Sequence, residues 1–142
     1  MKIFDKLNLK NLTKILVLNA PESFEPELAA LHGVGISRSL RGLAKIEFSL
    51  AFVREQKEVD KLAASIVKIA EGDPILWFAY PKGTSKNFKS DINRDNGWQA
   101  LEQAGFETVR LVAIDADWSA LRFRRRNFIT PPGRDTRRRT AK

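Results

Sequence analysis

The residues best suited to chemistry form a short polar loop, Lys82 to Lys86 (KGTSK), which follows a continuous apolar run at 75–80. Two ammonium groups and two hydroxyls around a glycine can surround a phosphate or another anion. Ser90 and Asp91 predict the first turn of a following helix, whose N-terminus would favour negative charge and bring Arg94 to the same place. The loop therefore predicts an anion-binding site. The alternative is a solvated surface loop whose lysines aid solubility.

Other groups that could do chemistry are few. The chain contains no cysteine and one histidine, His32, so thiol catalysis, disulfides, thiolate sites and a histidine-based metal cluster are excluded. A Ser-His-Asp triad would require His32 as its base. Asp91, Asp95, Asp115 and Asp117 could supply paired carboxylates, but the last two flank a turn that favours aspartate for local hydrogen bonds. We therefore expect no metal, no cofactor and no catalytic residues, and the sequence favours a binding domain over an enzyme.

Alternating strand and helix patterns position the candidate loop at one end of a sheet. Strands are predicted at 15–18, 43–53, 75–80, 108–114 and 118–124, helices at 26–33, 55–70 and 90–105, and a short helix or edge segment within 1–13. The glycines at 33–36 close a helix rather than open one, so they predict a turn and not a phosphate-binding loop. This order predicts an α/β fold: a three-layer Rossmann-like sandwich around a mainly parallel five-stranded sheet, whose C-terminal hairpin strand is antiparallel.

Ligands of an open parallel sheet bind outside the carboxyl ends of its strands. Those ends fall here at 19–21, 52–54, 80–82 and Asp115. The expected partner is an anionic small molecule, and the candidate ligand-binding residues are Asn19, Tyr80, Lys82, Thr84, Ser85, Lys86 and Arg94.

The positive charge of the chain is concentrated at its C-terminus. Residues 122–142 contain nine basic and one acidic residue, which equals the net charge of +8 of the whole chain, so the first 121 residues are balanced. Arginines can neutralise phosphates without reading sequence, which makes nucleic acid the alternative partner. Because the last strand runs antiparallel, these residues are expected on the far side from the candidate ligand site. They are Arg124, Arg125, Arg126, Arg134, Arg137, Arg138 and Arg139.

At 142 residues the chain has room for one domain with a real core. We expect that domain to cover residues 1–127, with 128–142 as a disordered basic tail. No apolar run approaches the roughly 20 residues that span a membrane, and the N-terminus has no continuous apolar stretch typical of a signal peptide. We expect no membrane partner. The absence of cysteine fits a cytoplasmic location, and the sequence leaves the oligomeric state open.

The second half of the chain resembles class I S-adenosylmethionine-dependent methyltransferases. It has their buried strand, loop, helix ending at Gly105 and returning hairpin strand. In that fold the last strand lies antiparallel between its two predecessors, which implies the order 1-2-3-5-4 for strands numbered along this chain. The family holds its cofactor with a glycine-rich turn after the first strand and an acid at the end of the second. Here Asn19-Ala20-Pro21 follows the first strand, and the chain is too short for the usual cofactor half. The resemblance implies a methyltransferase-like scaffold without its cofactor.

Three motifs resemble the pattern of a small bacterial domain family of unknown function. They are LWFAYPK (76–82), SDINRDNGW (90–98) and AIDADWSALRFR (113–124), and the resemblance covers roughly residues 15 to 125. It implies a fold and a bacterial origin, and it carries no established activity.

Overall fold

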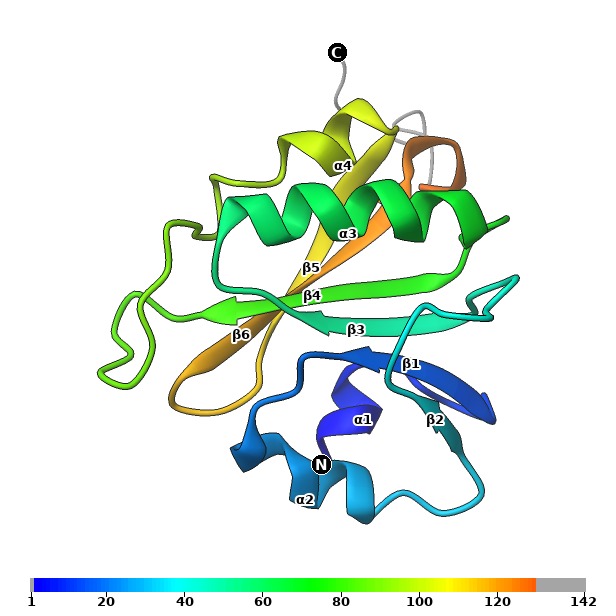
Figure 1. The fold of residues 1–142 in the computed structure, drawn as a ribbon, viewed down its shortest axis with the longest axis horizontal. Helices are drawn as coiled ribbons and strands as arrows, with labels where there is room; N and C mark the ends of the chain where they lie inside the picture. Colours follow the sequence, from blue (N-terminus) through cyan, green and yellow to red (C-terminus); the bar gives the residue numbers. More distant parts are fainter. Residues whose placement is uncertain (1, 130–142) are drawn as a thin grey trace.

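The computed structural model describes residues 2–129, which form a central sheet between helices (Figure 1). The strands are β1 (Lys14–Leu18), β2 (Gly35–Ser37), β3 (Phe48–Phe52), β4 (Ile75–Pro81), β5 (Phe106–Ala113) and β6 (Trp118–Arg125). The α-helices are α1 (Ile3–Lys6), α2 (Glu25–Ala29), α3 (Gln56–Ile69) and α4 (Gln99–Gln103), and single 3₁₀ turns cover Glu22–Phe24 and Arg126–Phe128.

The sheet has the strand order β2-β1-β3-β4-β6-β5. The strands β2, β1, β3 and β4 are parallel, and β6 is antiparallel between β4 and β5. The five predicted strands therefore occur in the predicted order, with the hairpin strand inserted as expected.

The strand β2 corrects the prediction of a turn at 33–36. It pairs in parallel with β1 at the edge of the sheet, with Gly35 opposite Lys14 and Ser37 opposite Leu16. The prediction failed because the strand is only three residues long and begins at a glycine, a residue depleted in strands. Gly33 does form a turn, with a φ of 71°.

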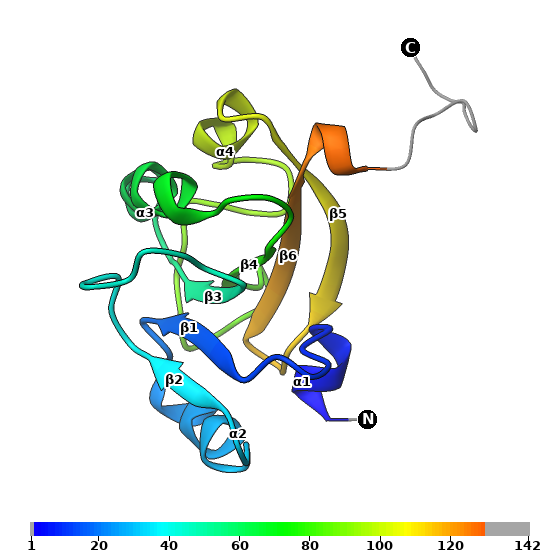
Figure 2. The same ribbon diagram turned by 90° about the vertical axis from the view of Figure 1, so that its right-hand side faces the viewer.

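Helices cover both faces of the sheet, as predicted (Figure 2). The helices α3 and α4 pack on one face against Leu76, Phe78 and Tyr80 of β4. The N-terminal segment and α2 pack on the other face, which carries Trp77 and Ala79. Trp77 has no exposed surface, so β4 is the buried centre that the sequence predicted.

Helix α3 forms where its pattern predicted it. Val59, Ala63 and Ile66 share the buried side at helical spacing. Its N-terminus is closed by a capping box, in which Glu55 and Glu58 accept hydrogen bonds from each other's backbone N–H groups.

Three predicted boundaries were wrong. The helix predicted at 26–33 ends at Ala29. The third strand in the chain begins at Phe48 rather than at 43, because Ile46 N–H bonds to the carbonyl of Ile69 outside the sheet. The helix predicted from Ser90 is replaced by side-chain turns, and α4 begins only at Gln99. The Ser90 hydroxyl accepts from Ile92 N–H at 3.1 Å, and Asn93 Oδ1 accepts from Asp95 N–H at 2.9 Å. Such local bonds compete with helix formation.

No helix within residues 2–129 is long and apolar enough to cross a bilayer. Residues 130–142, which include the predicted nucleic-acid residues Arg134, Arg137, Arg138 and Arg139 and most of the predicted tail, lie outside the described residues.

Candidate functional site

The carboxyl ends of β1, β3 and β4 lie together at one end of the sheet, where the sequence predicted the ligand site. Asn19 follows β1 in a left-handed conformation with a φ of 58°. Its side-chain amide donates to the carbonyl of Phe52 at 3.5 Å, a long bond that links the ends of β1 and β3. Asn19 is therefore engaged in joining two strand ends.

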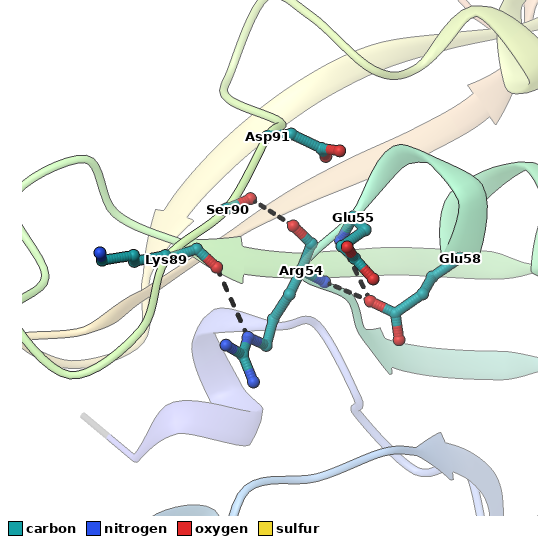
Figure 3. A pocket seen from close by; sticks show the side chains of 6 residues that line it. All are labelled: Arg54, Glu55, Glu58, Lys89, Ser90 and Asp91. Atoms are coloured by element: carbon teal, nitrogen blue, oxygen red, sulfur yellow. Dashed lines mark hydrogen bonds between the residues drawn. The ribbon is translucent and has the colours of Figure 1, made fainter.

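A hollow of about 480 Å³ opens beside the end of β3 and the first turn of α3 (Figure 3). It lies between the loop after β3 and the loop after β4, and its lining residues are Arg54, Glu55, Glu58, Lys89, Ser90 and Asp91. This volume falls within the range of pockets that hold small molecules.

The carboxylates Glu58 and Asp91 are occupied by backbone donors. Glu58 Oε1 accepts from the N–H groups of Arg54 at 2.8 Å and Glu55 at 3.1 Å. Asp91 Oδ1 accepts from Gln56 N–H at 2.8 Å. Both carboxylates therefore cap the N-terminus of α3, which is a structural task.

The cations of the hollow are less constrained. Arg54 Nε donates to the carbonyl of Lys89 at 3.5 Å, and the guanidinium lies 5.6 Å from the ring centre of Phe88. Among residues 2–129, neither Arg54 nor Lys89 forms an ion pair with a carboxylate. These two cations are the groups of the hollow that can meet an anion.

The predicted loop at 82–86 is folded around Asp117. The Ser85 hydroxyl donates to Asp117 Oδ1 at 2.8 Å, and the Asn87 amide donates to Asp117 Oδ2 at 3.1 Å. The backbone N–H of Lys82 donates to the Asp117 carbonyl at 2.7 Å. Ser85 is therefore a loop-ordering residue, while Thr84 and Lys86 are exposed.

The predicted turn role of Asp115 is confirmed. Its carboxylate accepts from the N–H groups of Asp117 at 2.8 Å and Trp118 at 2.9 Å, which closes the β5–β6 hairpin.

Tyr80 lies almost buried on the α3 side of β4, against the ring of Trp98 at 5.8 Å between centroids. Burial raises the pKa of its phenol above the ordinary value of 10.0, and the charge of nearby Arg94 opposes this shift. Two predicted site residues, Tyr80 and Arg94, are thus close to one another. They do not line the hollow beside β3.

The hollow adds residues that sequence reasoning did not select, above all Arg54 and Lys89. The available signal was position alone, since Arg54 falls within the strand end predicted at 52–54. No group of three or more His, Cys, Asp or Glu side chains that could hold a metal occurs within 2–129.

A second hollow of about 520 Å³ lies at the opposite, amino ends of β1, β2 and β3. Leu16, Ile36 and Leu43 give it an apolar lining, and Lys14 and Lys45 contribute to its wall. It is remote from the strand ends where this kind of sheet binds ligands.

The described arginines of the predicted nucleic-acid set lie at the far end of β6, as expected from its direction. Each is engaged within the protein. Arg124 forks onto the carboxylate of Asp73, with Nε 3.1 Å from Oδ1. Arg125 donates to the carbonyl of Gly72 at 2.8 Å, and Arg126 to that of Glu102 at 2.9 Å.

Comparison with known proteins gives a likeness in structure only. No protein-family model matches the chain, and no curated protein matches it. An S-adenosylmethionine-dependent methyltransferase from Aquifex aeolicus is similar over 87% of both chains, with a TM-score of 0.56 and 13% identity. Magnesium protoporphyrin IX methyltransferase from Synechocystis is similar over 86% of this chain and 74% of its own, with a TM-score of 0.54 and 11% identity. LepI, solved in complex with S-adenosylmethionine, is similar over 87% of this chain, with a TM-score of 0.55 and 10% identity. The match covers 39% of the LepI chain.

These comparisons define the class of fold. The sheet with its antiparallel C-terminal hairpin is a methyltransferase-like Rossmann fold, as the sequence predicted. At these identities the likeness establishes the fold alone.

The turn after β1 and the end of β2 lack the residue types with which Rossmann-type sheets usually hold a nucleotide cofactor. Rossmann-type sheets bring the backbone close to such a ligand through glycines after the first strand and hold its ribose with an acid about 20 residues on. Here Asn19 and Pro21 occupy the turn, and β2 is followed by Arg38. Arg38 forks onto Glu25 with two contacts of 2.8 Å, and this hydrogen bonding lowers the pKa of the Glu25 carboxyl. The end of β2 therefore carries an ion pair and not a free acid.

Proposed function

We propose that this chain is a binding domain with a methyltransferase-like fold, which takes an anionic small molecule at the carboxyl ends of its strands without using S-adenosylmethionine. One observation carries the proposal. In the hollow beside β3, Glu58 and Asp91 are occupied by backbone N–H groups, whereas Arg54 and Lys89 have no carboxylate partner among the described residues.

The geometry supports a small ligand with one anionic group. Arg54 presents a planar set of donors suited to a carboxylate or phosphate, and Lys89 adds a second charge. The carboxylates of the same hollow would repel a larger polyanion. A compact monoanion or dianion with neutral hydroxyl or amide groups therefore fits this mixed lining best.

The same contacts argue for binding rather than catalysis. Glu58 and Asp91, which line the hollow, and Asp117, which holds the loop at 82–86, each accept hydrogen bonds from backbone or side-chain donors of the protein. A general base must be free to reach a substrate proton, and these groups are committed to folding. The arrangement therefore supports recognition at this end of the sheet.

A titration followed by ¹H–¹⁵N NMR tests the proposal on the full chain. The ligands are inorganic phosphate, nucleoside monophosphates, sugar phosphates and S-adenosylhomocysteine. We expect at least one anion to shift the amides of Arg54 and Lys89. Arg54→Gln should weaken that binding about tenfold, because a hydrogen bond to a charged group contributes about 1.5–3 kcal/mol. Arg41→Gln, which removes the same charge from an exposed loop position, is the matched control.

Two results would contradict the proposal. In the first, no anion of the panel perturbs the hollow. In the second, S-adenosylhomocysteine binds with shifts centred on Asn19 and Arg38, which would restore the cofactor role of the fold.

A further inference from the structure

Two arginines face each other across the C-terminal hairpin. Arg110 of β5 is the register partner of Arg122 of β6, so both side chains lie on the same face of the sheet. Arg124, two residues further along β6, shares that face. Like charges placed directly opposite each other in a sheet are destabilising, so this arrangement calls for a compensating group.

The carboxylates near this face are already paired with other residues. Asp73 bonds to Arg124, and Glu107 lies 3.7 Å from Arg126. Among residues 2–129, no carboxylate forms an ion pair with Arg110 or Arg122.

Arg122 is half-buried, and its Nε is buried without a hydrogen-bond partner among residues 2–129. Burial lowers the pKa of its guanidinium and the charge of Arg124 lowers it further, while the charge of nearby Asp73 opposes these shifts. The guanidinium of Arg122 is therefore a half-buried charge that forms no ion pair with a carboxylate among residues 2–129.

This half of the face is accessible. The N-terminal segment and α1 pack over the other half of the hairpin, on Val112, Trp118 and Ala120. Figure 2 shows α1 beside the end of β5 that leads into the hairpin turn, away from the end where β6 finishes. Arg110 is exposed.

The chemistry around the pair points to an extended ligand. Arg122 and Arg124 are alternate residues of β6 and lie about 6.6 Å apart. Because Arg124 is paired with Asp73, the charges on this face that have no carboxylate partner among residues 2–129 are those of Arg110 and Arg122. The sequence continues into 130–142, which adds Arg134, Arg137, Arg138, Arg139 and Lys142 against Asp135 alone. Phe128, three residues after β6, is 42% exposed. Basic rows with exposed aromatic rings are typical of surfaces that bind single-stranded nucleic acid, where bases stack on the rings.

We propose that Arg110 and Arg122 bind the phosphate backbone of a single-stranded nucleic acid on the open face of the β5–β6 hairpin, with Phe128 available to stack a base. The site is separate from the hollow beside β3 and does not depend on the function proposed for it. It also differs from the residues that sequence reasoning selected, since Arg124, Arg125 and Arg126 serve mainly to hold the end of the hairpin.

Fluorescence anisotropy with labelled single-stranded DNA and RNA oligonucleotides, measured on the full chain over a series of salt concentrations, tests the proposal. We expect the doubly substituted R110Q/R122Q protein to bind at least tenfold more weakly than wild type at low salt. Its plot of log affinity against log salt should be shallower by about 1.4, since each phosphate contact to a single strand contributes about 0.7 to the slope. Phe128→Ala should weaken binding while leaving the slope unchanged.

Three control proteins define what the measurement means. Arg41→Gln removes one charge elsewhere and should bind like wild type. Arg110→Gln alone alters an exposed side chain, so it keeps the test valid if R110Q/R122Q fails to fold. The R137Q/R138Q/R139Q protein measures the contribution of the C-terminal residues separately.

The proposal is overturned if wild type does not bind either oligonucleotide at low salt, or if R110Q and R110Q/R122Q bind like Arg41→Gln. It is also overturned if the whole loss of affinity belongs to R137Q/R138Q/R139Q. A final arm uses inorganic phosphate alone. If phosphate raises the melting temperature of wild type but not of R110Q/R122Q while no oligonucleotide binds, the ligand is a small phosphate and not a nucleic acid.

Discussion

The indole Nε1 of Trp77 donates a hydrogen bond of 2.8 Å to the backbone carbonyl of Leu7, and neither residue has exposed surface. The two residues are 70 positions apart in the chain. This bond joins the N-terminal segment to the central strand at a point that water does not reach. The segment is therefore held by a specific polar contact in addition to its apolar packing.

Trp77→Phe should cost at least about 1–3 kcal/mol in the free energy of unfolding, because it leaves the carbonyl of Leu7 buried without a partner. Amide hydrogen exchange should accelerate across residues 3–9. Trp98→Phe is the matched control, since the Trp98 indole donates a bond of the same 2.8 Å to the nearby carbonyl of Asn93. The control should lower stability without accelerating exchange in the N-terminal segment. Equal exchange at 3–9 in both proteins would contradict the tethering role.

Gly97→Ala should destabilise the fold by roughly 2 kcal/mol or more, as expected for overpacking together with backbone strain. A Cβ at this position would collide with the Cγ2 atom of Ile92, and the φ of 107° disfavours any L side chain. Gly83→Ala, where nothing lies within 4 Å, should change stability by less than about 0.5 kcal/mol. Urea unfolding of both proteins makes the comparison, and similar midpoints would show that the loop at 92–97 adapts.

Arg122→Met should raise the free energy of unfolding by about 1 kcal/mol, because it removes a buried unpaired Nε and a like-charge contact with Arg110. The same change should reduce the stabilisation of the fold by added oligonucleotide. Thermal unfolding with and without the oligonucleotide measures both effects. Arg41→Met, at an exposed position, should alter neither. A loss of stability in Arg122→Met would mean that the guanidinium has a structural partner of its own.

We expect the free energy of unfolding to fall at alkaline pH because of the buried phenol of Tyr80. Burial raises the pKa of its phenol in the folded state above 10.0. Below pH 10 the phenol is neutral in both states, so its contribution is constant. Between the unfolded and the folded pKa only the unfolded state releases the proton, so stability falls as the pH rises, by at most about 1.4 kcal/mol per pH unit.

Tyr80→Phe should show a shallower fall over the same pH window than wild type. Because the chain contains one tyrosine, near-ultraviolet absorbance of tyrosinate reports the folded pKa directly. A phenol that titrates at or below its pKa in the urea-unfolded chain would contradict the effect of burial.

The regular parts of the fold could be predicted from the sequence because their signals are local. Val59, Ala63 and Ile66 recur at helical spacing before Gly72, and the apolar run at 75–80 has the composition of a strand covered on both faces. The order of strands followed from a resemblance to a known fold, which supplied the insertion of the last strand.

The parts that were missed depend on contacts that sequence patterns do not encode. The side chain of Ser90 was read as a helix cap, but it closes a turn of its own, as does the side chain of Asn93. β2 is three residues long and exists because β1 pairs with it.

The sequence predicted which strand ends meet, but not which side chains line the hollow beside them. The strand ends do come together, yet Ser85 is committed to Asp117, and the hollow is lined by Arg54 and Lys89 instead. The donors that bond to a carboxylate are set by the tertiary structure. The sequence therefore could not show which charged side chains are bonded within the protein and which can meet a ligand.

The position of β6 between β4 and β5 has a consequence for biosynthesis. A nascent chain cannot complete this sheet until residue 125 has left the ribosome, because the neighbour of β4 on one side is β6, Trp118–Arg125. Until then one side of the most apolar strand is an open edge, the kind of edge that promotes aggregation. We therefore expect a message truncated before Trp118 to yield a product that depends on chaperones or is degraded.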